Sequence, residues 1–600
     1  MFIKKSRHKF ADGSIKTQIT LAETFRPGKG LPPKTRTLKN YGYLEDQPDQ
    51  EKFIRDLETL VEQSRKSRQQ FELRIDTDRL INNPSNRDLN YGVLVIKKLY
   101  EQLRIPEFIR VHRKSKAKYD LNAILCYLTC MKIIFPDSKR ATYMDSKHVY
   151  GMDIRFDLQD VYAALTEICD LRFELQHHLQ KEVQRLLKAD KSYVYLDVTN
   201  TYMEMDFARE DTLPQRGVSK DHKTEPIIQM GLLLDSNGMP LLHECFPGNT
   251  SDTLVLQPMI EQVRKSGMTT GRIIVVADKG LNSGKNIDYL CNNGNGYVFS
   301  QILKGKKGSR YHARMFDETR YTYNSDGSYK WQLFEESFIG LDQDGKKVQR
   351  KRKVLIYWSA AQAKAAKMKR EEKVRRAKKA LSNNAYTIDH SKYKYIKAEK
   401  VDGTTGEILD NINDMLSIDS EKIDEEARFD GYFCIITSEM DYDEQRIREV
   451  YHNLWLIENT FRLEKTDQEM RAVYVWTDDH IRAHFMIGHL AALITRLIQY
   501  SMQKEAISAE RIKRVLTKCV LDIPVNGVVH LHDISGNIQF CSFVDAAGEK
   551  CYNLIETGKD EVFEDFVVLS RALNFSLKKA YMRQEDFNNL LASLSLSLQQ

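Results

Sequence analysis

The sequence predicts an α/β protein in which a helical part precedes an α/β core, and three observations carry this prediction. From about residue 50 to 190, apolar residues recur at three- and four-residue spacing, which is typical of helices. From residue 191 the spacing becomes strand-like, and apolar runs alternate with turns and two helical segments in the order βββαβαβ. A long polar stretch, 306–429, then separates this series from one more strand and a long helix. Because 600 residues exceed the size at which one hydrophobic core keeps growing, several domains are expected.

Residues 1–48 are predicted to form a basic, β-rich N-terminal arm. Two strand-like runs flank Asp12-Gly13, a dipeptide typical of hairpin turns. Basic residues outnumber acidic ones in this arm, which suits contact with DNA phosphates. A solvated β-hairpin explains the same pattern.

Residues 49–190 predict a helical domain, which we expect to bind DNA. The segment PDSKRATY, residues 136–143, interrupts the helical pattern with a proline and offers Ser138 as a helix cap. Lys139 and Arg140 follow this serine and are candidates for contact with phosphates. Helix capping alone also explains Ser138.

Residues 191–305 predict the first part of the α/β core. Three strands are read from YVYLDVTNTY, PIIQMGLLLD and MPLLHECFPGN, and Asn237-Gly238 predicts a hairpin between the last two. A helix, the strand GRIIVVAD, a helix capped near Ser283 and the strand GYVFSQIL complete the series.

Residues 306–429 predict an insertion domain, after which residues 430–505 resume the core. Within the insertion, Lys364–Lys379 carries nine Lys or Arg and two Glu, which is too charged for a core helix. A solvated helix and a helix that contacts a nucleic-acid backbone both fit this run. The long helix of the resumed core is predicted to begin at a capping box formed by Asp441 and Glu444.

Composition favours a cytoplasmic protein. The nine cysteines form no C-x-x-C pair, which fits free thiols better than disulfides or structural zinc. No apolar run of about 18 residues is present, so neither export nor membrane spanning is expected.

The C-terminal extension, residues 506–600, contains no functional motif. His530 and His532 have the spacing of half a metal site, but no partner is evident and surface histidines are the preferred reading.

Two carboxylates in strand-like runs are the first candidates for chemistry. Asp197 interrupts the apolar run YVYLDV, where an unpaired carboxylate costs several kcal/mol. Asp278 ends the run IIVVAD, and the two strands are expected to bring these residues together. Two neighbouring carboxylates repel unless one is protonated or a divalent cation lies between them, and Mg²⁺ suits such a pair.

A third acid is expected on the helix YHNLWLIENTFRLEK. At about 100° per residue, one face of this helix mixes aromatic, acidic and basic side chains, which is unusual for a buried stripe. A half-buried amphipathic helix with extended Arg and Lys side chains is the alternative. The face consists of Tyr451, Leu454, Trp455, Glu458, Arg462 and Lys465.

The chain resembles the DDE transposases of bacterial insertion sequences, in the IS-four-like superfamily marked by Y-x2-R-x3-E-x6-K. Tyr451, Glu458 and Lys465 match this signature in spacing, Trp455 stands where members often have Trp, and Leu454 replaces the arginine. Further matches are LDVTNTY, GVSKDHKTEPIIQMGLLLD, PGNTSD, VVADKGLNSGKN and IENTFRLEKTDQEMRAVYVW followed by HIRAHF.

The resemblance implies a ribonuclease H-like catalytic core that is interrupted by an insertion domain. Asp197, Asp278 and Glu458 would then be catalytic and would hold two Mg²⁺ ions, for which Mn²⁺ can substitute. Cleavage of the element's end and transfer of its 3′-hydroxyl to target DNA would use this one site. The residues that would contact DNA are Tyr451, Lys465, Arg462, Lys220, Lys139 and Arg140, with Trp455 stacking on a base.

The same resemblance implies the partners. They are double-stranded DNA with terminal inverted repeats, target DNA, and a second copy of the chain in a synaptic homodimer, with no membrane. The protein would be bacterial and cytoplasmic, and associated with the nucleoid when bound to DNA.

Two other readings compete with an active transposase. A transposase-derived protein that binds specific DNA sequences without cutting is compatible with Leu454 at the arginine position. A phosphotransferase of the haloacid dehalogenase type is disfavoured, because Thr199 stands where its second aspartate belongs. Four nearby acids compete with the chosen ones: Glu204, Asp206, Glu225 and Glu464.

Overall fold

A computed structural model divides the chain into two compact units, residues 1–83 and 84–600. The structure describes residues 2–10, 13–25, 34–47, 49–51, 53–55, 57–58, 61, 88–187, 193–205, 210–217, 225–265, 271–382, 393–398, 416–470, 473–525, 527–535, 538–544, 550–556, 560–575, 577 and 579–595.

The first unit contains a three-stranded antiparallel sheet in the order β1-β2-β3. Gly13 connects the first two strands at φ +86°, a conformation that glycine adopts without steric cost, and the hairpin predicted at this position is confirmed. The strands are β1 (Phe2–Lys9), β2 (Ile15–Phe25) and β3 (Lys34–Tyr43).

The second unit is built on a nine-stranded sheet in the order β10-β11-β12-β15-β9-β8-β5-β6-β7. Along the chain, three strands are followed by α8, β8, α9 and β9, which is the βββαβαβ order predicted from the sequence. The strands are β5 (Tyr193–Tyr202), β6 (Ile227–Leu234), β7 (Pro240–Pro247), β8 (Ile274–Ala277), β9 (Gly296–Ser300), β10 (Thr322–Tyr323), β11 (Tyr329–Leu341), β12 (Lys347–Ser359) and β15 (Tyr432–Thr437).

Strand directions divide this sheet into a parallel centre and antiparallel flanks. β8 is parallel to both β5 and β9, whereas β5-β6 and β6-β7 are antiparallel pairs. The hairpin between β6 and β7 turns at Gly238, with φ +76°, as Asn237-Gly238 predicts.

The segment 306–429 contributes strands to the same sheet. The long hairpin β11-β12 pairs through β12 with β15, which is itself paired with β9. The charged run predicted as a helix is α12 (Ala360–Ser382), in which only Ala377 is buried, so this helix presents a solvated face. Arg370 of α12 forms an ion pair with Asp430 just before β15. Two short strands also fall in this segment, β13 (Ile396–Ala398) and β14 (Leu416–Ile418).

Each face of the central strands is covered by its own pair of helices. Val194, Leu196 and Val198 of β5 belong to the apolar cluster that includes α8 (Leu256–Lys265) and α9 (Gly284–Asn292). Tyr193 and Tyr195 belong to the opposite cluster, with residues of α14 (Glu444–His452) and α15 (Trp455–Arg462). This alternation follows from the two-residue period of a strand.

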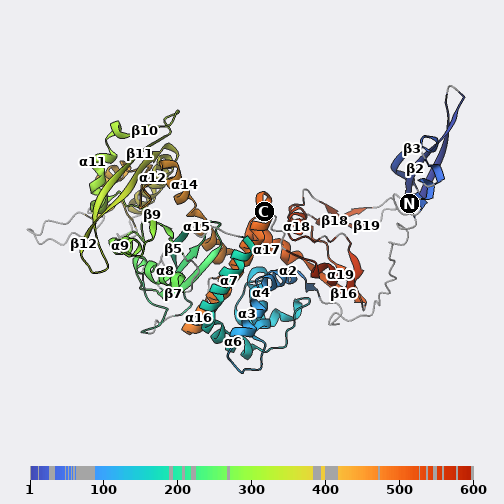
Figure 1. Cartoon of the computed structure of the whole chain (residues 1–600), viewed down its shortest axis with the longest axis horizontal. Helices are drawn as coiled ribbons and strands as arrows, with labels where there is room; N and C mark the ends of the chain where they lie inside the picture. Colours follow the sequence, from blue (N-terminus) through green and yellow to red (C-terminus); the bar gives the residue numbers. More distant parts are fainter. Residues whose placement is uncertain are drawn as a thin grey trace, which may run out of the picture. The chain divides into compact units, whose positions relative to one another are not determined.

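A helical body packs beside the sheet around α16 (Asp478–Met502), and Figure 1 shows α7 and α16 next to β7. By length and composition the segment Asp478–Glu505 is the one described helix able to cross a membrane, yet 89% of its most apolar 18-residue stretch is buried inside the protein. Its role here is that of a core helix. The other helices of the body are α2 (Gly92–Gln102), α3 (Ile105–His112), α4 (Leu121–Ile134), α5 (Lys139–Met144), α6 (Leu158–Asp170) and α7 (Arg172–Leu187).

The C-terminal residues add to this helical body. A four-stranded sheet in the order β20-β17-β16-β4 combines strands from both ends of the second unit. Helix α17 (Ala509–Lys518) begins after Ser508, whose side chain accepts a hydrogen bond from the Arg511 N–H. The remaining elements are β4 (Leu89–Asn90), β16 (Val520–Val525), β17 (Val528–Leu531), β18 (Ile538–Val544), β19 (Lys550–Glu556), α18 (Glu561–Ala572), β20 (Tyr581–Arg583) and α19 (Gln584–Ala592).

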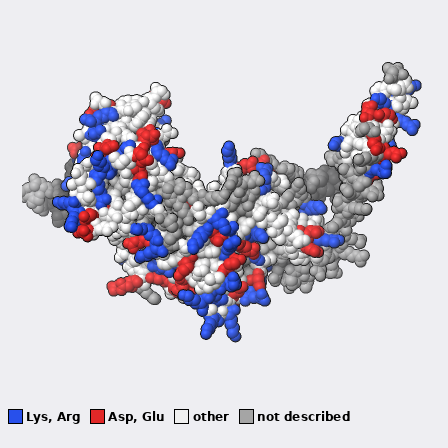
Figure 2. All heavy atoms as spheres, in the orientation of Figure 1, with Lys and Arg blue, Asp and Glu red and all other residues white. Residues whose placement is uncertain are grey.

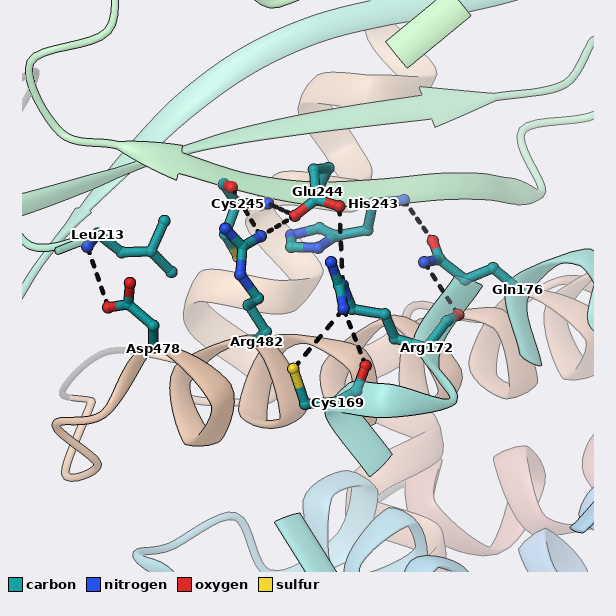
Figure 3. Close-up of polar contacts among 9 residues, drawn as sticks. All are labelled: Cys169, Arg172, Gln176, Leu213, His243, Glu244, Cys245, Asp478 and Arg482. Atoms are coloured by element: carbon teal, nitrogen blue, oxygen red, sulfur yellow. Dashed lines mark hydrogen bonds and ion pairs between the residues drawn. The ribbon is translucent and has the colours of Figure 1, made fainter. Parts of the chain in front are cut away.

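Charged side chains join the edge strand β7 to the helical body (Figure 3). Glu244 of β7 accepts a hydrogen bond from Arg482 of α16 and lies 3.8 Å from Nε of Arg172 in α7. Gln176 of α7 accepts a 2.7 Å hydrogen bond from the backbone N–H of His243. The partly buried Glu244 therefore connects the sheet to two helices.

We expect Glu244→Gln to lower the free energy of unfolding by about 2 kcal/mol, because two partly buried guanidinium groups lose their carboxylate. Chemical denaturation of the full chain measures this change. Asp344→Asn is the matched control, since Asp344 and Lys346 form an exposed pair 3.9 Å apart in the turn between β11 and β12. Equal effects of the two substitutions on the free energy of unfolding would show that Glu244 does not stabilise the contact between β7 and the helices.

Candidate active site

Asp197 and Asp278 lie side by side on neighbouring parallel strands. The register pairs Leu196 with Ala277, so the two aspartates follow at the next position of each strand. Because Tyr195 and Val276 belong to the cluster under α14 and α15, Asp197 and Asp278, two positions further on, point to that same face. Both carboxylates are partly buried.

Two hydroxyl groups contact the carboxylate of Asp278. Ser300, the next residue in register on β9, donates a 2.6 Å hydrogen bond to Oδ1, and Tyr451 donates a 3.2 Å hydrogen bond to the same atom. Burial, and then the charge of Asp278, raise the pKa of the Tyr451 hydroxyl well above its usual value, so this group stays protonated as a donor. Within the described residues, Oδ2 of Asp278 receives no hydrogen bond and remains available to a cation.

Glu458 lies on α15, over the same face of the sheet. Its side chain is exposed, and it makes no ion pair or hydrogen bond with the described part of the chain. A cavity of about 870 Å³ is lined by Asp278, Tyr451, Trp455 and Glu458, among others. Asp197 is not among the lining residues and approaches this group from β5, beside Asp278.

The helix that carries Glu458 is not continuous, which corrects the sequence-based expectation. α14 is capped by Asp443, not by Asp441, and ends at His452. A turn at Asn453 and Leu454 then precedes α15. In this turn the N–H of Leu454 donates a 3.0 Å hydrogen bond to the carbonyl of Tyr451. Leu454 is buried among apolar residues, so its side chain holds the turn against the core under the sheet.

Other predicted residues of this helix lie in different surroundings. Trp455 is 47% exposed at the cavity. Lys465 lies in a π-helical turn, Leu463–Asp467, and donates to the Thr199 hydroxyl and, at 3.1 Å, to the Asn200 carbonyl, both just beyond Asp197 on β5. Arg462 is exposed and donates a 2.9 Å hydrogen bond to Asn459.

Lys139 and Arg140, the DNA contacts predicted in the helical domain, do not line the cavity. Lys139 is buried at the start of α5, behind the predicted cap Ser138, which accepts a hydrogen bond from the Ala141 N–H. Arg140 is exposed, and Lys220 lies outside the described residues. Figure 2 shows Lys and Arg interspersed with Asp and Glu on the face in view.

Sequence reasoning missed Ser300 and a partner for the two C-terminal histidines. Ser300 ends a strand in the run GYVFSQIL, and a polar residue at a strand end beside Asp278 was the available signal. Among the described residues, Asp522, His530 and His532 have ligand atoms within 4.8 Å of one another. Asp522 lies opposite His530 on the neighbouring strand, so the expectation that these histidines have no partner is wrong.

Asp197 lies within β5 and Asp278 directly after the end of β8, so the two carboxylates share one face of the sheet. Carboxylates are the hard ligands that Mg²⁺ and Mn²⁺ prefer. Residues 206–494 match the family model described as a transposase DDE domain. This match supports a DDE transposase with a transposase function, a family whose domains generally use divalent metal ions. The matched stretch contains Asp278 and Glu458 and begins just after Asp197. A search of curated proteins finds no match.

Proposed function

We propose that this protein is a DNA transposase that cleaves at the ends of an insertion sequence and transfers the 3′-hydroxyl ends to target DNA. The observation that carries the proposal is the placement of Asp197 and Asp278 abreast on one face of the sheet, under the helix of Glu458. The domain match adds independent support. The strand order β7-β6-β5-β8-β9, with two parallel pairs after two antiparallel ones, favours a ribonuclease H-like core.

The three carboxylates fit a divalent metal centre. Oδ2 of Asp278 and the exposed carboxylate of Glu458 are free of hydrogen bonds within the described residues, and Asp197 lies on the strand next to Asp278. Bound Mg²⁺ or Mn²⁺ would supply activation of the attacking oxygen and stabilisation of the leaving oxygen at the phosphodiester. Ser300 and Tyr451 would hold the Asp278 carboxylate in one orientation, which leaves Tyr451 a positioning role in addition to the expected contact with DNA.

Lys465 and Trp455 complete the proposed site. The ammonium of Lys465 lies next to Thr199 and Asn200, two and three residues beyond Asp197, where it would attract the phosphate that follows the cleaved bond. The indole of Trp455 is exposed at the cavity and offers a surface on which a base can stack.

We expect Trp455→Ala to weaken binding of a cleaved or hairpinned DNA end by about 1 to 3 kcal/mol, because one stacking partner is lost. Fluorescence anisotropy with labelled end oligonucleotides measures this change. Phe563→Ala is a matched control at another exposed aromatic residue, 48% accessible and absent from the cavity lining. A Trp455→Ala protein that binds such ends as tightly as the parent would exclude stacking.

The function is tested with the DNA that flanks the gene in its source genome. Purified protein is incubated with this DNA and Mg²⁺, beside a Ca²⁺ reaction and the Glu458→Gln variant, and the 3′ ends are mapped. Discrete cuts at a pair of inverted repeats, absent from both controls, are the expected result. Sequence-specific binding without cuts in any reaction would instead establish a silenced DNA-binding protein.

A silenced protein is the second candidate because Leu454 replaces the signature arginine. Leu454 is buried, 8% exposed, and lies at the turn between α14 and α15. If no cleavage is found, Leu454→Arg is the variant that tests whether the missing guanidinium is the cause.

A further inference from the structure

A second polar pocket, of about 160 Å³, lies in the helical body. Its walls come from the end of α4, the start of α5, the segment after the π-helical turn, and α16. The residues on which the argument depends are Lys132, Lys139, Glu469, Tyr474 and His484.

Two lysines in this pocket are buried without a carboxylate partner. Lys132 is 4% exposed and Lys139 is 6% exposed, and neither forms an ion pair within the described residues. Nζ of Lys132 donates to the Glu469 carbonyl at 3.3 Å, and Nζ of Lys139 lies 3.4 Å from Nδ1 of His484. Burying an unpaired ammonium costs several kcal/mol, so a pair of them requires a compensating anion or loss of protons.

The pKa values of the two lysines agree with this geometry. Burial lowers the pKa of Lys132 to about 7 and that of Lys139 to about 8. For Lys132 the charges of Lys139 and Lys513 act in the same direction, while Glu469 and Asp137 oppose them. Asp137 and Glu469 also line the pocket, but neither carboxylate forms an ion pair with Lys132 or Lys139 within the described residues.

His484 adds a third nitrogen to the same pocket. Its side chain is 5% exposed, and Nε2 makes no hydrogen bond within the described residues. Burial, and then Lys139 and Lys132, lower the pKa of the imidazole well below 6.5, with the Met470 backbone acting the other way. A neutral imidazole can donate one hydrogen bond to an anion beside the two ammonium groups.

We propose that Lys132, Lys139 and His484 form a phosphate-binding pocket. A phosphate group offers several oxygens at once and carries the charge that two ammonium groups lack. In the DNA complex the occupant is a backbone phosphate away from the cleaved bond, an assignment that rests on the proposed transposase function.

The position of the pocket suits a DNA anchor. Val473 pairs with Met203, which lies just beyond the end of β5 and six residues after Asp197. Six strand residues span about 20 Å, or about six base steps of DNA.

Tyr474 and Trp476, 58% and 67% exposed, alternate with buried Val473 and Val475 and present two aromatic rings beside the pocket. These rings would pack against the nucleotides that flank the anchored phosphate.

The pocket itself is tested with inorganic phosphate and the full chain. We expect isothermal titration against phosphate, at an ionic strength matched with chloride, to show one site per chain. In the double variant Lys132→Met, Lys139→Met, the affinity should fall at least tenfold. Lys346→Met, which removes an exposed lysine, should leave it unchanged.

Two further readouts separate loss of the site from loss of the fold. The double variant should melt at a higher temperature than the parent in chloride, because two buried unpaired ammonium groups are gone. Phosphate binding by the parent at pH 8 should take up protons, seen as a dependence of the binding heat on the buffer, because the bound anion favours the charged lysines. Unchanged phosphate affinity in a folded double variant would overturn the proposal.

The source of the phosphate is tested with a 30-base-pair duplex of mixed sequence. The slope of log affinity against log salt concentration should decrease by about one in the double variant, as for the loss of one phosphate contact. Loss of phosphate binding with an unchanged slope would keep the pocket but overturn its assignment to DNA. Neither readout depends on cleavage, so a failure of the proposed transposase activity is recognised separately.

Discussion

Asp278→Asn is expected to reduce DNA cleavage by about a thousandfold or more, and Asp197→Asn and Glu458→Gln are expected to do the same. Each substitution would remove one proposed anionic ligand of a divalent cation. Such a cation is worth several kcal/mol in the transition state, and about 1.4 kcal/mol corresponds to a tenfold change in rate. Gel analysis of cleavage under single-turnover conditions measures the effect. Affinity for DNA should change little, because these acids make no favourable contact with phosphates without the metal.

Glu449→Gln is the matched control for these variants. Glu449 lines the same cavity on α14 but pairs with Arg446 at 2.9 Å and lies outside the acidic group. Its cleavage rate should stay within a few-fold of the parent. An acid variant that still cleaves at the parental rate would remove that residue from the catalytic site.

Glu464→Gln is expected to stabilise the protein at pH 8 and to have little effect at pH 5. Glu464 is 2% exposed, and neither carboxylate oxygen has a hydrogen-bond partner within the described residues. Burial raises its pKa from 4.5 to about 8, against the opposing charges of Lys465 and Arg496. Because the folded state holds this proton more tightly than the unfolded state, the contribution to stability is complete below pH 4.5 and is lost as the pH rises toward 8.

The size of this effect is a few kcal/mol at pH 8, since one pKa unit corresponds to about 1.4 kcal/mol and burial shifts of this kind are partly relieved by relaxation. Urea denaturation at pH 5 and at pH 8 measures it. Glu371→Gln is the control, because Glu371 is exposed on α12. Identical pH dependence of stability in the parent and in Glu464→Gln would show that Glu464 is not the buried acid assumed.

The sequence predicted those parts of the fold that follow from local pattern. The order of strands and helices around Asp197 and Asp278, and the hairpins at Gly13 and Gly238, have short-range signals and were found as expected. The break between α14 and α15 was not predicted, because it depends on the burial of Leu454 against residues distant in sequence. The cap at Asp443 in place of Asp441 is a shift of the same helix start by two residues.

Contacts between distant strands also escaped sequence reasoning. Ser300 reaches Asp278 only because β9 pairs in register with β8, and Asp522 meets His530 only through the β16-β17 pair. Lys132 belongs to an apolar helical run, LNAILCYLTCMKIIF, in which a single lysine ordinarily reaches solvent. Its burial follows from packing of α4 against α16.

The central claim is that Asp197, Asp278 and Glu458 form one metal site, and Mn²⁺ binding measured by electron paramagnetic resonance tests it most directly. The titration uses the protein–DNA complex in a His530→Ala, His532→Ala background, which removes the Asp522 group from the count. Two Mn²⁺ ions per chain are expected, with at least one lost in each of the three acid variants and both retained in Glu449→Gln. Parental binding in Asp197→Asn, Asp278→Asn and Glu458→Gln alike would contradict the claim.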